Sequence, residues 1–308
     1  MLQSHYHNTM QWSIGRTLTN LAREFRPNAV LGAWADPDGT VAIRQAHSLG
    51  VPGGVIAMGS DLMLLPSDRQ RRRVIAATLQ GADHVFAVGS VLRKIAIELG
   101  AGPERVSNFL CGVDLDRFGP GIRAEARTRL GLRADGSLLL WIGSMGAVKA
   151  AERLLYAAAR LTPELPELSV VLVGDGPRRA FLEHVVAETP ALTGRVRFAG
   201  PVNHDELPDW YRAASLFVLP SRSEGVPNVL LEAMTCGIPF VASDVGSISD
   251  LLPYGPSAVV PEGDIAALTA AIAAALRGLS TTIAPRPFDR LDGARHLLHH
   301  LGLDRGAP

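Results

Sequence analysis

Two glutamates stand on either side of a turn that starts a helix, within the segment 220–250. Glu224 lies in the loop after an apolar stretch, and Glu232 lies eight positions later, about one turn inside the expected helix. Backbone N–H groups at such a helix start attract an anion such as a phosphate. Two carboxylates beside that anion repel each other unless both accept hydrogen bonds from the ligand. The vicinal hydroxyls of a sugar can donate such hydrogen bonds. The pattern favours a ligand with hydroxyls and phosphates. Taken alone, the two glutamates also fit an alternative without a ligand, in which one is a charge at the helix start and the other is an exposed surface residue.

Lysine usage singles out one further position. Lys94 and Lys149 are the only lysines among the 30 basic residues, and all the others are arginine. Lys149 follows the apolar run 138–142 in a short loop that contains glycine. We therefore interpret Lys149 as a candidate ligand-binding residue, against the alternative of a generic surface lysine.

The elements that must position these residues alternate between short apolar runs and amphipathic segments, the pattern of βα units in a parallel sheet. The expected strands of the second half are 138–142, 170–173, 196–198, 216–219, 239–242 and 259–260. The expected helices are 150–161, 178–187, 206–213, 228–235 and 265–276. This succession predicts a Rossmann-like domain of about 140 residues.

The first half shows the same alternation less regularly. The expected strands are 29–31, 54–57, 84–87 and 106–110, and the expected helices are 18–25, 41–49, 69–80 and 90–99. The segment 119–136 is rich in Gly, Pro and Arg and is predicted to be a hinge. We thus expect an α/β protein with a domain over 1–118, a linker over 119–136, a domain over 137–278 and a tail or helix over 279–308. Two such domains usually bind their ligand in the cleft between them.

Composition excludes several classes of protein. The 308 residues are 47% hydrophobic, which suffices for two domain cores, and Lys+Arg 30 balance Asp+Glu 30, which argues against a general nucleic-acid binder. Cys111 and Cys236 lack metal-ligand spacing and are expected to be free thiols in a reducing cytosol. No signal peptide or membrane-spanning run is visible. A basic cluster over 69–73 fits a solvated helix face, or a peripheral contact with the inner face of a membrane.

The segment after the fourth strand of the second half resembles the signature of family 4 glycosyltransferases, the retaining group with the GT-B fold. The matching residues are Pro220-Ser221, Glu224-Gly225-x-Pro227-Asn228, Glu232-Ala233-Met234 and Gly237-x-Pro239. The loop from Ile142 to Lys149 resembles the first strand and loop of the family's donor domain, and 198–202 resembles the loop along the nucleobase. The turn 173–177 is interpreted as structural. In the first half, 111–118 and 57–61 are similar to family segments more weakly.

The resemblance implies that the chain transfers a hexose-type sugar from a nucleotide-diphosphate sugar to a glycan or lipid-linked acceptor, with retention of configuration and without a metal or other cofactor. Lys149 would neutralise the diphosphate, Glu224 would contact donor-sugar hydroxyls, and Glu232 would accept hydrogen bonds from the ribose hydroxyls. Stabilising the departing nucleoside diphosphate is the main catalytic requirement of such chemistry. The resemblance also places donor-binding residues at Gly143, Ser144, Gly200, Val202, Gly225, Val226, Pro227, Asn228 and Val229.

Several positions depart from the family pattern. Ser144 stands where an arginine usually completes the diphosphate clamp, and Met58 stands where many members carry a histidine. The strand and Gly-rich loop that open the family's N-terminal domain are not found before Ala29, so we expect that domain to be incomplete. The turn over 36–39 fits either acceptor binding or an ordinary turn.

These departures leave two other functions open. One is a catalytically impaired relative that binds a nucleotide-sugar or a partner protein. The other is a Rossmann dehydrogenase, which the absence of a Gly-x-Gly-x-x-Gly fingerprint argues against.

Overall fold

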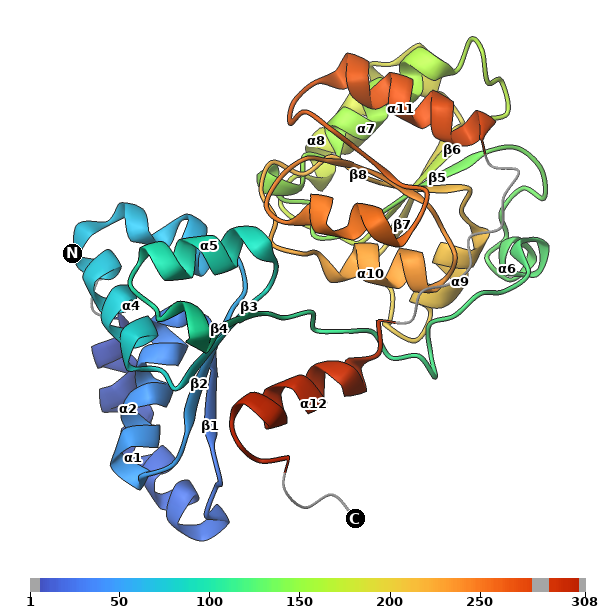
Figure 1. The fold of residues 1–308 in the computed structure, drawn as a ribbon. Coiled ribbons are helices and arrows are strands. Elements are labelled where there is room, and N and C mark those ends of the chain that lie inside the picture. Colours follow the sequence, from blue (N-terminus) through green and yellow to red (C-terminus); the bar gives the residue numbers. More distant parts are fainter. Residues whose placement is uncertain (1–5, 279–287, 305–308) are drawn as a thin grey trace. The chain divides into compact units, whose positions relative to one another are not determined.

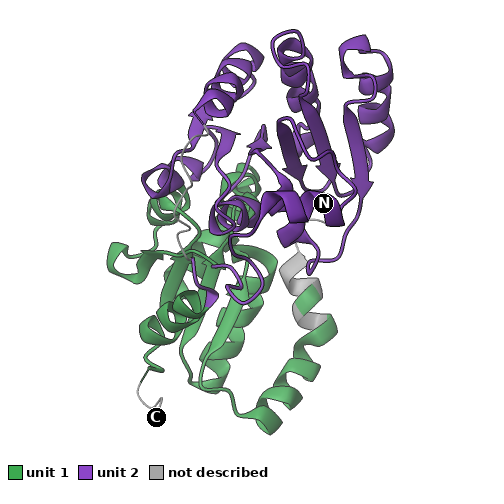
Figure 2. Ribbon diagram, turned by 90° about the vertical axis from the view of Figure 1, so that its right-hand side faces the viewer, with its two compact units in different colours: residues 1–111, 291–308 green, residues 112–290 purple. Residues whose placement is uncertain are grey.

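The computed structural model describes residues 6–278 and 288–304. The chain divides into two compact units, one made of residues 1–111 and 291–308 and the other of residues 112–290 (Figure 2). The second unit is therefore one continuous stretch, whereas the first is built from both ends of the sequence.

The second unit holds a parallel sheet of six strands (Figure 1). The strands are β5 (Leu138–Ile142), β6 (Ser169–Val173), β7 (Val196–Gly200), β8 (Leu216–Leu219), β9 (Phe240–Ser243) and β10 (Ala258–Val260). Their order is β10-β9-β8-β5-β6-β7, so the winding direction reverses between β5 and β8. Open sheets of this order bind ligands outside the carboxyl ends of the strands at that reversal.

Helices cover this sheet because its strands are apolar on both faces. They are α7 (Glu152–Leu161), α8 (Arg179–Ala187), α9 (Leu207–Ala213), α10 (Asn228–Thr235) and α11 (Ile265–Arg277). Alternate strand residues such as Leu139, Trp141 and Val218 pack with α7, α8 and α11 in one buried cluster. Side chains of opposite parity, such as Phe217, face the other way, and Phe217 contacts the Tyr211 ring of α9 at 5.7 Å between centroids.

A helix lies in the segment that the sequence indicated to be a hinge. The helix α6 (Arg123–Arg129) packs against α9. Arg127 of α6 is buried and donates to the backbone carbonyls of Ala213, Ala134 and Gly136. Because these bonds fix α6 to the second unit, the expectation of a flexible linker over 119–136 is wrong for this helix.

The first unit contains a smaller parallel sheet in the order β1-β2-β3-β4. Its strands are β1 (Val30–Ala33), β2 (Gly53–Ala57), β3 (His84–Ala87) and β4 (Val106–Asn108). Its helices are α1 (Tyr6–Phe25), α2 (Thr40–Leu49), α3 (Ser60–Met63), α4 (Arg69–Gly81) and α5 (Ser90–Glu98). The succession confirms the predicted α/β class.

The helix α12 (Arg290–His300) returns to the first unit. Its His296 Nε2 lies 2.8 Å from the Ser107 hydroxyl on β4, and its His300 ring stacks on the His84 ring of β3 at 4.1 Å. Leu301, just after the helix, is buried. The predicted tail over 279–308 is thus partly this packed helix, while 279–287 and 305–308 lie outside the described residues.

The boundary between the units also differs from the predicted one. Residues 112–118 belong to the second unit, where Val113 N–H donates to Phe288 O and Asp114 pairs with Arg290 at 2.9 Å. The prediction ended the first domain at residue 118 because 111–118 resembles the segment that ends the family's N-terminal domain. Over the described ranges, no helix is long and apolar enough to cross a bilayer.

Candidate functional site

The loops after β5 and β8 meet at the reversal point of the larger sheet. Lys149 lies in the first loop, and its Nζ donates to Glu224 Oε1 at 2.7 Å and to Oε2 at 2.9 Å in the second. The Glu224 side chain is only 8% exposed and that of Lys149 is 31% exposed. The two residues that the sequence singled out therefore form one ion pair, 75 positions apart in the chain.

The backbone around Lys149 is held in an unusual conformation. Ala150, the next residue, is buried and has a φ of 46°, in the left-handed region that residues other than glycine seldom adopt. The loops are joined directly, because Arg222 N–H donates to Val148 O at 2.8 Å. Such strain is found where the surroundings fix a side chain in place, here Lys149 against Glu224.

A third loop, after β9, supports the one that carries Glu224. Ser247 N–H donates to Gly225 O at 3.1 Å, and Gly246 has a φ of 59°. A Cβ atom on Gly246 would lie 2.0 Å from Glu224 O. Only glycine allows this approach, so Gly246 is required for the position of the Glu224 backbone.

The helix α10 begins beside this loop. Pro227 precedes its first residue, Asn228, and Val226 and Pro227 are buried while Asn228 is exposed. The sequence predicted this helix start, and the N–H groups at Asn228 and Val229 lie where an anion is attracted.

Glu232 lies in the second turn of α10 and has two polar partners. Tyr211 of α9 donates its hydroxyl proton to Glu232 Oε2 at 2.6 Å, and His204 Nε2 lies 3.2 Å from Oε1. Burial, followed by the Glu232 charge, raises the pKa of Tyr211 well above its usual value, so the hydroxyl stays protonated. These two partners were not predicted from the sequence.

Ser144, in the position expected to hold an arginine, is exposed in the β5 loop. Two other arginines lie in neighbouring strand-end loops: Arg178, after β6, and Arg222, after β8. Both contact Glu152 Oε1 of α7, Arg178 at 3.1 Å and Arg222 at 3.4 Å. Arginines that follow strands of a parallel sheet are the signal that could have identified them.

The glycines of the predicted site serve the backbone. Gly174 has a φ of 119°, and a Cβ there would lie 2.0 Å from Gly143 O, so the turn after β6 packs closely on the β5 loop. Gly200 has a φ of 77° at the end of β7, and Val202 lies half-buried beyond it. The structural interpretation of the turn 173–177 fits this packing.

In the first unit, the residues singled out follow β1 and β2. Asp61 is buried and accepts the N–H groups of Ala35 at 3.0 Å and Gly59 at 2.7 Å, while burial raises its pKa. Asp36 is buried too and accepts a hydrogen bond from the Thr40 hydroxyl at 3.3 Å. Met58 is 39% exposed.

Comparisons with known proteins match this architecture. Residues 136–278 match the family of glycosyl transferases group 1. The chain is 37% identical over 235 residues to D-inositol 3-phosphate glycosyltransferase 2 of Catenulispora acidiphila, covering 73% of this chain and 54% of that protein. It is 41% identical over 207 residues to the D-inositol 3-phosphate glycosyltransferase of Thermobifida fusca, covering 64% and 48%. The chain thus spans about half the length of the curated relatives it matches.

Solved structures show the same fold. HepE from Anabaena, in complex with UDP, has a TM-score of 0.79 and 19% identity, covering 94% of this chain and 81% of that one. Sucrose-phosphate synthase from Thermosynechococcus elongatus has a TM-score of 0.77 and 24% identity, covering 94% and 78%. The two parallel α/β units therefore have the GT-B fold. Residues 136–278 thus form a domain of the group 1 glycosyltransferases, known also as family 4.

Proposed function

We propose that this chain transfers a hexose-type sugar from a nucleotide-diphosphate sugar to an acceptor, with retention of the anomeric configuration. The observation that carries the proposal is the Lys149–Glu224 pair next to the start of α10, with Glu232 one turn further on. HepE, whose fold is similar, binds UDP and UDP-glucose.

The residues of the site suit a diphosphate leaving group. Lys149 has three N–H donors and uses two on Glu224, so one is available for a phosphate oxygen. The amides of Asn228 and Val229 add the positive end of the helix dipole. Glu224, neutralised by Lys149, retains lone pairs for donor-sugar hydroxyls. This field stabilises the departing diphosphate without a metal ion.

The acceptor of this proposal is a glycan or a lipid-linked sugar. The relatives from Catenulispora acidiphila and Thermobifida fusca are named for D-inositol 3-phosphate, so a phosphorylated cyclitol belongs in the acceptor panel.

The donor assignment is tested by thermal unfolding of the purified chain with UDP, GDP and ADP. A ligand that binds only the native state at about 100 times its Kd adds about 2.7 kcal/mol, which raises the Tm by roughly 5–10 °C. We expect one of these nucleotides to give such a shift and Glu232→Ala to abolish it. An unchanged shift in that variant would disprove the ribose assignment.

Transfer itself is tested with the matching nucleotide-sugar and an acceptor panel. Turnover with retained configuration supports the enzyme, whereas nucleotide binding without transfer or donor hydrolysis supports the alternative of a catalytically impaired relative that binds a nucleotide-sugar or a partner protein.

We propose in addition a peripheral contact between α4 and an anionic membrane surface. Arg69, Arg72 and Arg73 are exposed on α4, and Leu64 shortly before it is 55% exposed. Arginines beside an apolar side chain favour anionic lipid. Sedimentation with anionic vesicles, but not with zwitterionic ones, and its loss when the three arginines become Gln would support this contact; equal binding to both vesicles would contradict it.

A further inference from the structure

The carboxylate of Glu232 is held from two sides before any ligand arrives. Tyr211 OH occupies one position on Oε2 and His204 Nε2 one on Oε1. A carboxylate offers about four lone-pair sites. One site on each oxygen therefore remains, which matches the two neighbouring hydroxyls of a ribose.

The tautomer of His204 follows from its other neighbour. Arg117 Nη1 lies 3.0 Å from His204 Nδ1. A guanidinium only donates, so Nδ1 must be the acceptor and the ring proton must be on Nε2, facing Glu232. Arg117 also pairs with Asp205 Oδ1 at 2.5 Å, which holds its guanidinium beside the ring.

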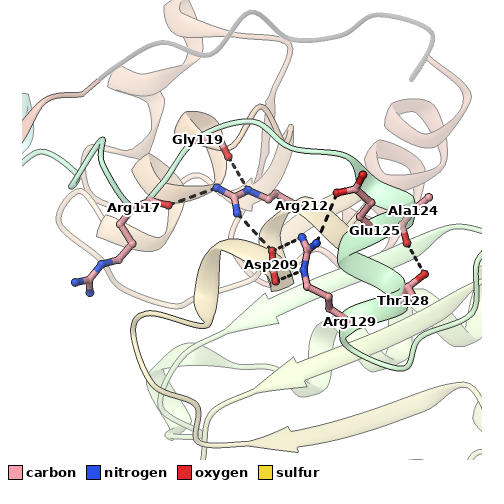
Figure 3. Close-up of polar contacts among 8 residues, drawn as sticks. All are labelled: Arg117, Gly119, Ala124, Glu125, Thr128, Arg129, Asp209 and Arg212. Atoms are coloured by element: carbon pink, nitrogen blue, oxygen red, sulfur yellow. Dashed lines mark hydrogen bonds and ion pairs between the residues drawn. The ribbon is translucent and has the colours of Figure 1, made fainter.

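Apolar and polar packing fix this arrangement. The Phe118 ring lies 5.1 Å from the His204 ring and 6.0 Å from the Tyr211 ring, measured between centroids. Arg212, next to Tyr211, donates to Gly119 O at 2.9 Å and to Arg117 O at 3.4 Å (Figure 3).

A second contact joins α9 to the helix α6, which follows this segment in the chain. Asp209 of α9 binds Arg129 of α6 at 2.7 and 2.9 Å (Figure 3). Helix α9 thus holds both Tyr211 and the segment that carries Arg117.

We propose that Tyr211 and His204 are positioning residues that orient Glu232 toward the ribose hydroxyls of a nucleoside diphosphate, and that Arg117 selects the His204 tautomer this requires. The inference rests on the proposed donor binding. It assigns roles to three residues outside the glutamate motif.

The test compares two ligands in calorimetric titrations: the ribonucleoside diphosphate that stabilises the chain, and its 2′,3′-dideoxy analogue. The wild type should prefer the ribonucleotide because only it donates to Glu232. Tyr211→Phe removes a hydrogen bond to a charged group, so we expect ribonucleotide binding to weaken roughly tenfold to a hundredfold. Binding of the dideoxy analogue should change less than about threefold.

His204 provides the second arm of the test. Because its side chain is 53% exposed, we expect its replacement to leave the fold intact. We expect His204→Ala and Arg117→Ala to reduce the preference for the ribonucleotide, and His204→Gln, whose amide can donate, to restore part of it. Tyr156→Phe, at an exposed tyrosine of α7, is the matched control for Tyr211→Phe.

The outcomes separate the inference from the proposed function. If the wild type discriminates between the two ligands and the variants keep its full preference, the positioning roles are wrong while donor binding stands. Equal loss for both ligands also overturns the positioning roles, because it shows general damage to the site. If the wild type binds no nucleoside diphosphate, the proposed function fails, and the inference fails with it. Should Tyr211→Phe not fold, the His204 variants decide.

Discussion

Replacing Lys149 by Ala is expected to destabilise the second unit as well as weaken donor binding. The substitution leaves Glu224, 8% exposed, without the ammonium group that donates to both of its oxygens. A buried acceptor that loses a charged partner cannot recover full hydration, so the loss is felt in the folded state.

The magnitude follows from the burial of the pair. A hydrogen bond to a charged group contributes about 1.5–3 kcal/mol, and breaking a fully buried ion pair costs about 3–5 kcal/mol. Because the Lys149 side chain is 31% exposed, water screens part of this interaction. We expect a loss of about 2 kcal/mol, or a Tm lower by roughly 4–8 °C.

Urea unfolding of four variants measures this loss. Lys149→Ala and Glu224→Gln are made singly and together, so that the double-mutant cycle gives the coupling energy, for which we expect about 1–2 kcal/mol. Lys94→Ala is the matched control, because Lys94 is the chain's other lysine and is exposed on α5. We expect that control to stay within about 0.5 kcal/mol of the wild type. If Lys149→Ala costs no more than Lys94→Ala, or if the two site substitutions simply add, the pair does not hold the loops together.

Three further outcomes are expected. Gly246→Ala should lower stability by about 2 kcal/mol or more and weaken nucleotide binding, because its Cβ would collide with Glu224 O. Gly131→Ala is the control for backbone strain alone, because Gly131 has a φ of 60° and open space where a Cβ would lie. Equal losses of stability in the two variants would refute the collision with Glu224 O. Burial, with repulsion from His300 and His296, lowers the pKa of His84 from 6.5 to about 4, so α12 docking is fully stabilised above pH 6.5 and weakens as the pH falls toward 4. Amide exchange in α12 should rise over that window. The rise should be smaller in His84→Gln, where His296 and His300 still titrate with lowered pKa values, and unchanged in a His184→Gln control. The absence of any rise would contradict this prediction. Transfer activity should survive EDTA, since Lys149 and the α10 amides supply the positive charge, and a loss restored by a divalent cation would show otherwise.

Much of the fold could be predicted from the sequence. The strands 84–87 and 216–219 and the helix 228–235 were predicted with the bounds that the structure gives them, because buried strands of a parallel sheet are continuous apolar runs. The helix α6 was missed because Gly, Pro and Arg around it are typical of a linker, whereas its burial depends on Arg127 reaching carbonyls in other segments. Tertiary contacts of that kind leave no periodic pattern.

The candidate site was also predicted only in part, because some of its residues reach it through tertiary contacts. Glu224 and Lys149 stand in loops directly after strands, where the topology alone brings them together, and the structure shows their side chains in contact. Tyr211, His204 and Arg117 reach the site by side-chain contacts from α9, the loop before it and the segment after β4. No spacing rule connects positions that are 87 residues apart.

The return of α12 to the first unit also sets an order of events during synthesis. Residues 112–290 form one continuous unit that is complete when residue 290 has left the ribosome. The sheet that begins at Val30 must wait for His296 and Leu301 before the β3–β4 side of its surface is covered. Domains tend to fold as they emerge, N-terminal first, but here the unit whose synthesis starts first is the last to be finished. Until then this side of the sheet lacks its covering helix, because Ser107 and its partner His296 are 189 positions apart in the chain. Contacts between residues so distant in sequence form slowly.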